Sequence, residues 1–314
     1  MNARVRFLGR RLGQAVVTLW GLTVVVFLMF QALPGNAAAA MFGARTSEAD
    51  IRRVNHELGL DKPLWTQYWH YLTRLLHGDL GTSVMYNRPA REVIFDALPT
   101  TVELAVYAVV LTAIVTVVLA MIAAMQRDKP IDHIIRSVPV VGLGLPTFWI
   151  GTMLLFVFAL KFQLFPAGGV QPGFIGLISS MFLPACALAI LFTAILVRSL
   201  RSSLLEVLDS DHVLTARSKG AHGVRLVLRH VLPNAAIPTV TLVGLIFAGL
   251  LGGALIVESV FALPGIGSLL ISGFRAHDFA LVQGITLLSA VGILLVNIVI
   301  DVLYSILDPR VGLS

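Results

Sequence analysis

Several stretches of this chain are apolar for longer than the roughly 18 residues that cross the hydrocarbon core of a bilayer. Of its 314 residues, 57% are hydrophobic and only 13% are charged, and the mean hydropathy is +0.88. Soluble domains carry about a quarter of charged residues, so this composition is far from theirs. The sequence therefore predicts an all-α, polytopic membrane protein.

The apolar stretches predict six transmembrane helices, near residues 12–33, 101–125, 138–160, 175–197, 238–257 and 281–306. With the N-terminus in the cytoplasm, the inner segments hold 14 of the 23 Lys and Arg residues, which agrees with the positive-inside rule. Six spans then place both termini in the cytoplasm. The net charge of +6 is accordingly interpreted as a signal of loop topology and not of nucleic-acid binding.

These spans divide the chain into four parts. Residues 1–33 form the cytoplasmic N-terminus with the first helix, and residues 34–100 form an extracytoplasmic loop. Residues 101–306 form a five-helix core, which includes a cytoplasmic loop at 198–237. Residues 307–314 form a cytoplasmic tail.

The outer loop at 34–100 is too long to be a simple connection, since most connections are short. We expect it to form short helices at the outer face. Its aromatic residues Trp65, Tyr68, Trp69 and Tyr71 are typical of the belt at a membrane–water interface. A ligand site built from the same rings is the alternative interpretation.

The loop at 198–237 is polar and basic, and it lies between two strongly apolar segments. Its pattern predicts two amphipathic helical pieces broken by glycines. Gly220 fits a helix end because glycine takes positive φ without penalty, and Pro233 fits the start of the returning helix. Two interpretations stay open: docking of a soluble partner, and attraction to anionic lipid at about 1 kcal/mol per cation.

Ionisable residues are nearly absent from the centres of the predicted spans. An ion-coupled carrier usually has carboxylates or histidines at mid-depth, where they couple the ion to transport. The sequence therefore favours a pathway whose energy comes from elsewhere. Asn297 and Asp301 are interpreted first as residues that form hydrogen bonds between helices.

Candidate residues for a translocation pathway come from helix-breaking and small positions. Pro146 removes a backbone hydrogen bond and predicts a kink in the third span. Small residues four apart in the fifth span allow close approach of helices, within the chain or against a second membrane subunit. The predicted pathway residues are Pro146, Phe148, Gly249, Gly253 and Asn297. Helix packing without a pathway is the alternative.

The common motifs for covalent chemistry do not occur in the sequence. It has no glycine-rich P-loop for ATP, no His-Glu-x-x-His, no Cys-x-x-Cys and no Gly-x-Ser-x-Gly. Its eight histidines are scattered, and its one cysteine, Cys186, lies in an apolar run. We expect no enzymatic activity, no catalytic residue, no metal site and no cofactor in this chain.

The loop at 198–237 resembles the cytoplasmic loop of binding-protein-dependent ABC importers, whose pattern is Glu-Ala-Ala-x3-Gly-x9-Ile-x-Leu-Pro. The chain keeps four positions of this pattern: Ala216, Gly220, Leu232 and Pro233. It departs from the pattern at Leu214, Thr215 and His230. The run from Thr215 to Gly220, Thr-Ala-Arg-Ser-Lys-Gly, is similar instead to one branch, the dipeptide, oligopeptide and nickel permeases.

Short elements similar to that branch occur in order along nearly the whole chain. They are Leu58–Asp61, Gly78–Ser83, Leu98–Thr101, Leu145–Gly151, Phe165–Gly169, Val257–Phe261, Pro264–Gly267 and Tyr304–Arg310. Each is weak alone, but their order and spacing together are specific. The large outer loop after the first span resembles that of the B-type dipeptide permease subunits.

This resemblance implies the permease fold of type I ABC importers, with six transmembrane helices, an outer helical loop and a cytoplasmic coupling loop. It implies a place in the bacterial cytoplasmic (inner) membrane and a part in peptide uptake. The implied partners are a second homologous permease, two ATPase subunits that bind ATP and Mg, a substrate-binding protein, the lipid bilayer and a peptide substrate. No nucleic acid is expected.

For the coupling loop, the resemblance implies a short helix that lodges in a groove of an ATPase subunit. Arg217 and Lys219 would then pair with carboxylates on that subunit. The predicted coupling residues are Asp211, Thr215, Ala216, Arg217, Lys219, Gly220 and Ala221.

Other functions stay open at this stage. The same family also imports nickel, glutathione or haem, and cargo choice rests mainly with the binding protein. A self-sufficient secondary carrier would show internal repeats and charge at mid-membrane depth. A purely structural membrane scaffold is the third possibility.

Overall fold

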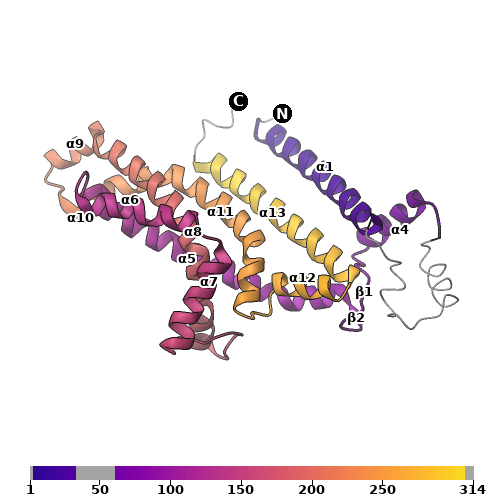
Figure 1. Cartoon of the computed structure of the whole chain (residues 1–314). Helices are drawn as coiled ribbons and strands as arrows, with labels where there is room; N and C mark the ends of the chain where they lie inside the picture. The colour runs from indigo at the N-terminus through magenta and orange to yellow at the C-terminus, as the bar shows by residue number, and fades with distance from the viewer. Residues whose placement is uncertain (1–2, 33–60, 308–314) are drawn as a thin grey trace. The chain divides into compact units, whose positions relative to one another are not determined.

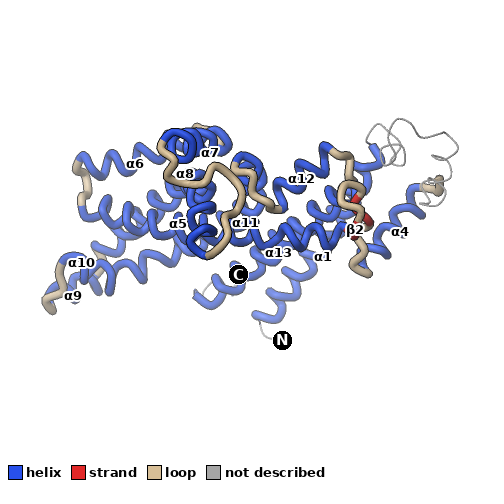
Figure 2. Tube along the Cα trace, turned by 90° about the horizontal axis from the view of Figure 1, so that it is seen from below, coloured by secondary structure: helices blue, strands red, loops and turns tan. Residues whose placement is uncertain are grey.

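The computed structural model describes residues 3–32 and 61–307, and most of these residues lie in helices (Figure 1). The strands among them are two residues long each: β1 (Thr82–Ser83) pairs antiparallel with β2 (Arg88–Pro89) (Figure 2). The part of the predicted outer loop at 34–60 lies outside the described residues. Two compact units divide the chain, residues 1–100 with 264–294 and residues 101–263 with 295–314.

In the first unit, α4 (Leu64–Leu76) packs on α1 (Ala3–Ala32) through aromatic side chains. The hydroxyls of Thr23 and Tyr68 form a buried 2.9 Å hydrogen bond. The ring of Phe27 meets Tyr68 edge-on, with a centroid distance of 5.4 Å. Trp65 and Trp69 stay exposed on α4, and their rings stack with centroids 6.3 Å apart.

The core of the first unit forms where the start of α5 (Ala90–Met125) meets α12 (Ile266–Arg275) and α13 (Phe279–Leu307). The α5 residues in this core have helical spacing: Ala90, Val93, Ile94 and Ala97. This apolar face explains why α5 begins at Ala90, earlier than the predicted span at 101–125. Apolar burial at one face stabilises the added turns even though Pro99 removes one helical hydrogen bond.

Asp278, which directly precedes α13, ties this helix to the β-ribbon. Its side chain is fully buried. One carboxylate oxygen accepts hydrogen bonds from the Ser83 hydroxyl at 2.6 Å and the Met85 backbone N–H at 3.0 Å. The other accepts the backbone N–H of Leu281 at 3.2 Å, which caps the first turn of α13. A single carboxylate thus satisfies three donors.

In the second unit, the central helix is α8 (Phe174–Leu208), which contacts α6 (Pro130–Leu143), α7 (Thr147–Leu154) and α11 (Leu232–Val260). In the most apolar 18-residue stretch of α8, 67% is buried, whereas the corresponding value for α5 is 33%. The side chain of Thr101 donates a 2.7 Å hydrogen bond to the buried carboxylate of Glu258, which connects α5 with α11.

The predicted third span at 138–160 is a broken helix. Helix α6 ends at Leu143, and α7 begins after Pro146, whose backbone is extended with ψ 136°. Proline disfavours the helical conformation of the residue before it, which explains a break where a kink was expected. A π-helical segment, η1 (Leu155–Lys161), continues α7.

Among the described residues, three helices are long and apolar enough to cross a membrane: Ala90–Met125, Phe174–Leu208 and Phe279–Ile300. Three shorter apolar helical segments accompany them: Gly13–Met29 within α1, Thr147–Lys161 and Ile266–Arg275. The mainly helical class is therefore confirmed for the described residues. The full set of six spans stays a prediction.

Replacing Asp278 with alanine should destabilise the first unit, because the Ser83 hydroxyl and two backbone N–H groups lose a buried acceptor. We expect a loss on the order of 2–3 kcal/mol, typical of buried donors left without partners. Thermal unfolding of the detergent-solubilised protein measures it. Asp96→Ala is the matched control, since Asp96 is 68% exposed and pairs with Arg88 at the surface. Equal melting temperatures for the two variants would contradict the capping role of Asp278.

Candidate functional site

The predicted docking loop at 198–237 folds into short helices separated by turns, at one end of the second unit (Figure 1). Helix α8 runs on into the loop as far as Leu208. Then follow α9 (Asp211–Ser218), α10 (Gly223–Leu226) and the π-helical η2 (Val227–Val231), and α11 starts at Leu232. Of the two helical pieces expected here, the first is therefore partly an extension of α8.

Helix α9 packs against an apolar cluster through Val213. Val213 is fully buried, and it packs with Leu200 and Leu204 of α8 and with Leu226 and Val231 of the returning chain. Ala120 and Ala124 near the end of α5 complete the cluster on another side. A helix of eight residues is marginal by itself, so this packing stabilises its conformation.

The C-terminal end of α9 is a Schellman motif centred on Gly220. The Ala221 N–H donates to the Ala216 carbonyl at 3.1 Å, and the Gly220 N–H donates to the Arg217 carbonyl at 2.9 Å. Gly220 has φ +90°, a conformation that glycine adopts without strain because it has no Cβ. Ala216 and Ala221, whose backbones form the longer bond, both pack against the apolar cluster. The expected helix stop at Gly220 is thus the observed one.

Most of the cationic side chains of these short helices are exposed. Arg217, Lys219, Arg225 and Arg229 are exposed, and Asp211 is the single carboxylate between residues 211 and 229. Three large apolar side chains are exposed among them: Leu214, Val224 and Leu228. Apolar side chains surrounded by charge are typical of a protein interaction surface.

The seven predicted coupling residues therefore fall into two groups. Asp211, Thr215, Arg217, Lys219 and Gly220 are exposed. Ala216 and Ala221 face the apolar cluster and hold the helix in place.

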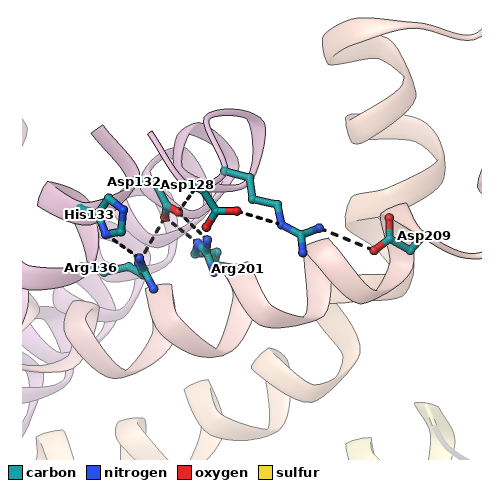
Figure 3. A network of polar contacts seen from close by, with 7 residues as sticks. Asp128, Asp132, His133, Arg136, Arg201 and Asp209 are labelled. Atoms are coloured by element: carbon teal, nitrogen blue, oxygen red, sulfur yellow. Dashed lines mark hydrogen bonds and ion pairs between the residues drawn. The ribbon is translucent and has the colours of Figure 1, made fainter. Parts of the chain in front are cut away.

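Asp132, which sequence reasoning missed, is fully buried beside the loop (Figure 3). Arg201 of α8 donates two hydrogen bonds to it, the one from Nε measuring 2.6 Å. The Asp128 backbone N–H donates a third at 3.0 Å, and Arg136 Nε lies 3.4 Å away. The sequence shows a carboxylate among the cations of the segment 126–137, but it does not show that this carboxylate is buried or which cation binds it.

The charge state of Asp132 follows from two opposing effects. Burial raises the pKa of this carboxyl, but the hydrogen bonds and charges of Arg201, with the Asp128 N–H and Arg136, outweigh it and lower the pKa below its ordinary value. A lowered pKa in the folded state stabilises the fold at pH values above about 3.9, the value for an unfolded aspartate. The contribution is lost as pH falls below that value.

The predicted pathway residues lie on three helices of the second unit. Pro146 caps α7, and Phe148 in its first turn is exposed. Asn297 is half-buried in α13, and Gly249 and Gly253 lie within α11. Near Pro146 there is an open apolar cavity of about 250 Å³, lined by residues that include Gly142, Leu145, Trp149, Met153 and Ile190. Neither Pro146 nor Phe148 lines it.

Within the described part of the chain, no group of three or more His, Cys, Asp or Glu side chains could hold a metal ion. The candidate site is the exposed surface of α9 and α10, which packed helices support, and it can act through apolar contacts and ionic interactions.

Residues 116–313 match the family described as "Binding-protein-dependent transport system inner membrane component". Residues 4–105 match the family of the N-terminal part of such membrane components. Among solved structures, an amino acid ABC transporter matches with a TM-score of 0.52 at 20% identity, over 68% of this chain and 93% of that chain. This likeness shows the fold.

Curated relatives match along nearly their whole length. The probable D,D-dipeptide transport system permease protein DdpB of Escherichia coli K12 is 35% identical over 321 residues, which cover 95% of this chain and 94% of the relative. The dipeptide transport system permease protein DppB of the same strain is 35% identical over 334 residues, 98% of each chain. A putative peptide transport system permease protein of Brucella abortus is 35% identical over 305 residues, 96% of this chain and 97% of the relative.

The family matches reach from residue 4 to residue 313 with a short gap, and the helical architecture agrees with them. This chain therefore belongs to the family of binding-protein-dependent transport system inner membrane components.

Proposed function

We propose that this chain is a permease subunit of an ABC importer for peptides and that its coupling loop receives the movements of a partner ATPase. It crosses the bacterial inner membrane six times with both termini in the cytoplasm. It pairs with a second, homologous permease, with two ATPase subunits that bind ATP and Mg, and with a substrate-binding protein. The peptide permease names of relatives that align over nearly the whole chain support the cargo.

One observation carries the coupling role: α9 has exposed basic side chains and is supported by packed helices at the buried Val213. A push on α9 would press Val213 against Leu200 and Leu204 of α8. Close-packed interiors have low compressibility, so such a displacement is passed on to α8 and is not absorbed locally. The loop is therefore suited to act as a lever without any reactive group.

The energy for switching has to come from outside this chain. Moving a transporter between strongly inward and strongly outward populations takes about 5.5 kcal/mol of differential binding. ATP held between two partner ATPase subunits would supply it, and α9 would deliver it to α8.

The translocation pathway is proposed along Pro146, Phe148, Gly249, Gly253 and Asn297. The helix break before α7 supports this, because the residues between α6 and α7 form a non-helical turn. Irregular backbone at membrane depth is tolerated where protein or a water-filled cavity surrounds it.

Gly220→Trp should abolish ATP-dependent uptake of a labelled dipeptide into proteoliposomes that contain this chain, its partner subunits and the binding protein. The indole would protrude from the turn after α9, where no atom lies within 4 Å of an added Cβ, and would block docking. We expect at least about tenfold less co-purified ATPase, since a loss of about 1.4 kcal/mol suffices for that factor.

Gly220→Ala is the control. It causes the same backbone strain at φ +90° as the tryptophan variant, but it adds only a methyl group, which projects into open space. It should keep most of the uptake. If the alanine variant loses uptake as fully as the tryptophan variant, strain at the turn and not blocked docking is the cause. If the wild-type complex takes up no peptide with ATP present, the cargo assignment is wrong.

Arg217→Glu should weaken binding to the ATPase subunits, because the exposed basic surface requires an acidic partner surface. Lys62→Glu is the matched control, an equal charge change at an exposed residue of the proposed outer loop. Co-purification at rising ionic strength measures the effect, and the wild-type complex should weaken with salt. If Arg217→Glu leaves co-purification unchanged but lowers binding of the loop to anionic vesicles, the basic surface serves lipid and not an ATPase.

A further inference from the structure

A short inner connection, residues 126–129, joins α5 to α6 and is fastened to α8 by Asp132. Asp132 lies in the first turn of α6, and its carboxylate accepts both hydrogen bonds of the Arg201 fork. The same carboxylate accepts the backbone N–H of Asp128, which has φ +61°. The turn before α6 and the inner part of α8 are thereby held by one group.

A second, weaker contact repeats this connection closer to α9. The guanidinium of Arg127 lies 3.7 Å from a carboxylate oxygen of Asp209, at the end of α8 (Figure 3). It also lies 3.6 Å from Asp128. These groups are exposed, so their ion pairs contribute little by themselves. The contact with Asp209 nevertheless places residue 127 of the connection close to the turn between α8 and α9.

Arg201 stands between residues that support α9. Its neighbour Leu200, and Leu204 one turn further, pack with Val213 in the apolar cluster. The rotation of α8 about its axis at this point decides both whether Arg201 reaches Asp132 and whether the two leucines meet Val213. A bidentate guanidinium–carboxylate pair fixes such a rotation more narrowly than apolar contacts do.

Stability alone does not account for this pair. Asp132 is 0% exposed and Arg201 is 12% exposed, so both charges have lost most of their hydration. Replacing a buried ion pair by apolar groups of similar size is often neutral or stabilising, whereas removing one partner is strongly destabilising. Apolar side chains could stabilise this contact equally well, so the property specific to the pair is its fixed geometry.

We propose that Asp132 is a positioning residue for the coupling loop: it holds Arg201 and so fixes the rotation of α8 that keeps α9 aligned. The connection between α5 and α6 then moves together with the loop as one block. This inference rests on the proposed function, because it concerns how ATPase movement reaches the membrane helices.

Three variants test it in the reconstituted complex: Asp132→Asn, Arg201→Met and the double variant. Four quantities are measured: melting temperature, co-purified ATPase, the rate of ATP hydrolysis and the number of peptides taken up per ATP hydrolysed. Asp128→Asn is the matched control, because Asp128 is 77% exposed, lies in the same connection, and is replaced by a residue that tolerates positive φ.

Asp132→Asn leaves the buried Arg201 without a carboxylate, and Arg201→Met leaves Asp132 with only Arg136 and the Asp128 N–H as partners. Each single variant should therefore lower the melting temperature. The double variant removes both charges and should recover the melting temperature and the co-purified ATPase. Its uptake per ATP should stay about tenfold below the wild type, a factor within the usual range of coupling between sites. The Asp128→Asn variant should match the wild type in all four quantities.

A double variant that recovers wild-type uptake per ATP would overturn the proposal, since the pair would then only neutralise buried charge. So would a single variant that folds less stably but keeps the wild-type ratio. Failure of the proposed function is seen separately, as a wild-type complex that shows no ATP-dependent uptake at all.

Discussion

Buried carboxylates and their donors fix where the helices of this protein meet. Apolar contacts alone leave helices free to rotate and slide, because lipid is as apolar as the side chains that they present. Asp278, Glu258 and Asp132 are each fully buried, and each accepts hydrogen bonds from another segment of the chain. A buried acceptor without its donor is costly, so these three contacts specify one arrangement within each unit.

The sequence could predict the parts of the fold that depend on periodicity and on special residues. Helical class, the family and the helix end at Gly220 followed from apolar stretches, ordered motifs and the need for positive φ. The start of α5 at Ala90 was missed, although its apolar residues have helical spacing. The pairing of Asp132 with Arg201 spans 69 residues, and a single sequence contains no signal for a contact at that distance.

The same limit applies to the coupling residues. Motif positions predicted seven residues as one set, but the fold separates Ala216 and Ala221, which pack inward, from the exposed members. A motif records which positions matter and not in which direction their side chains point. The support behind α9, from Val213 to α8, became visible only when helices distant in sequence were brought together.

The shortness of α9 has a consequence for biogenesis. Eight residues form only about two turns, and such a segment is a poor helix until Leu200, Leu204 and Val231 provide its support. These residues come from segments before and after it, so α9 is expected to become a stable helix only once the chain on both sides has been made. An ATPase that binds α9 would therefore select permeases that have already folded, and nascent or damaged chains would be left without an energy source.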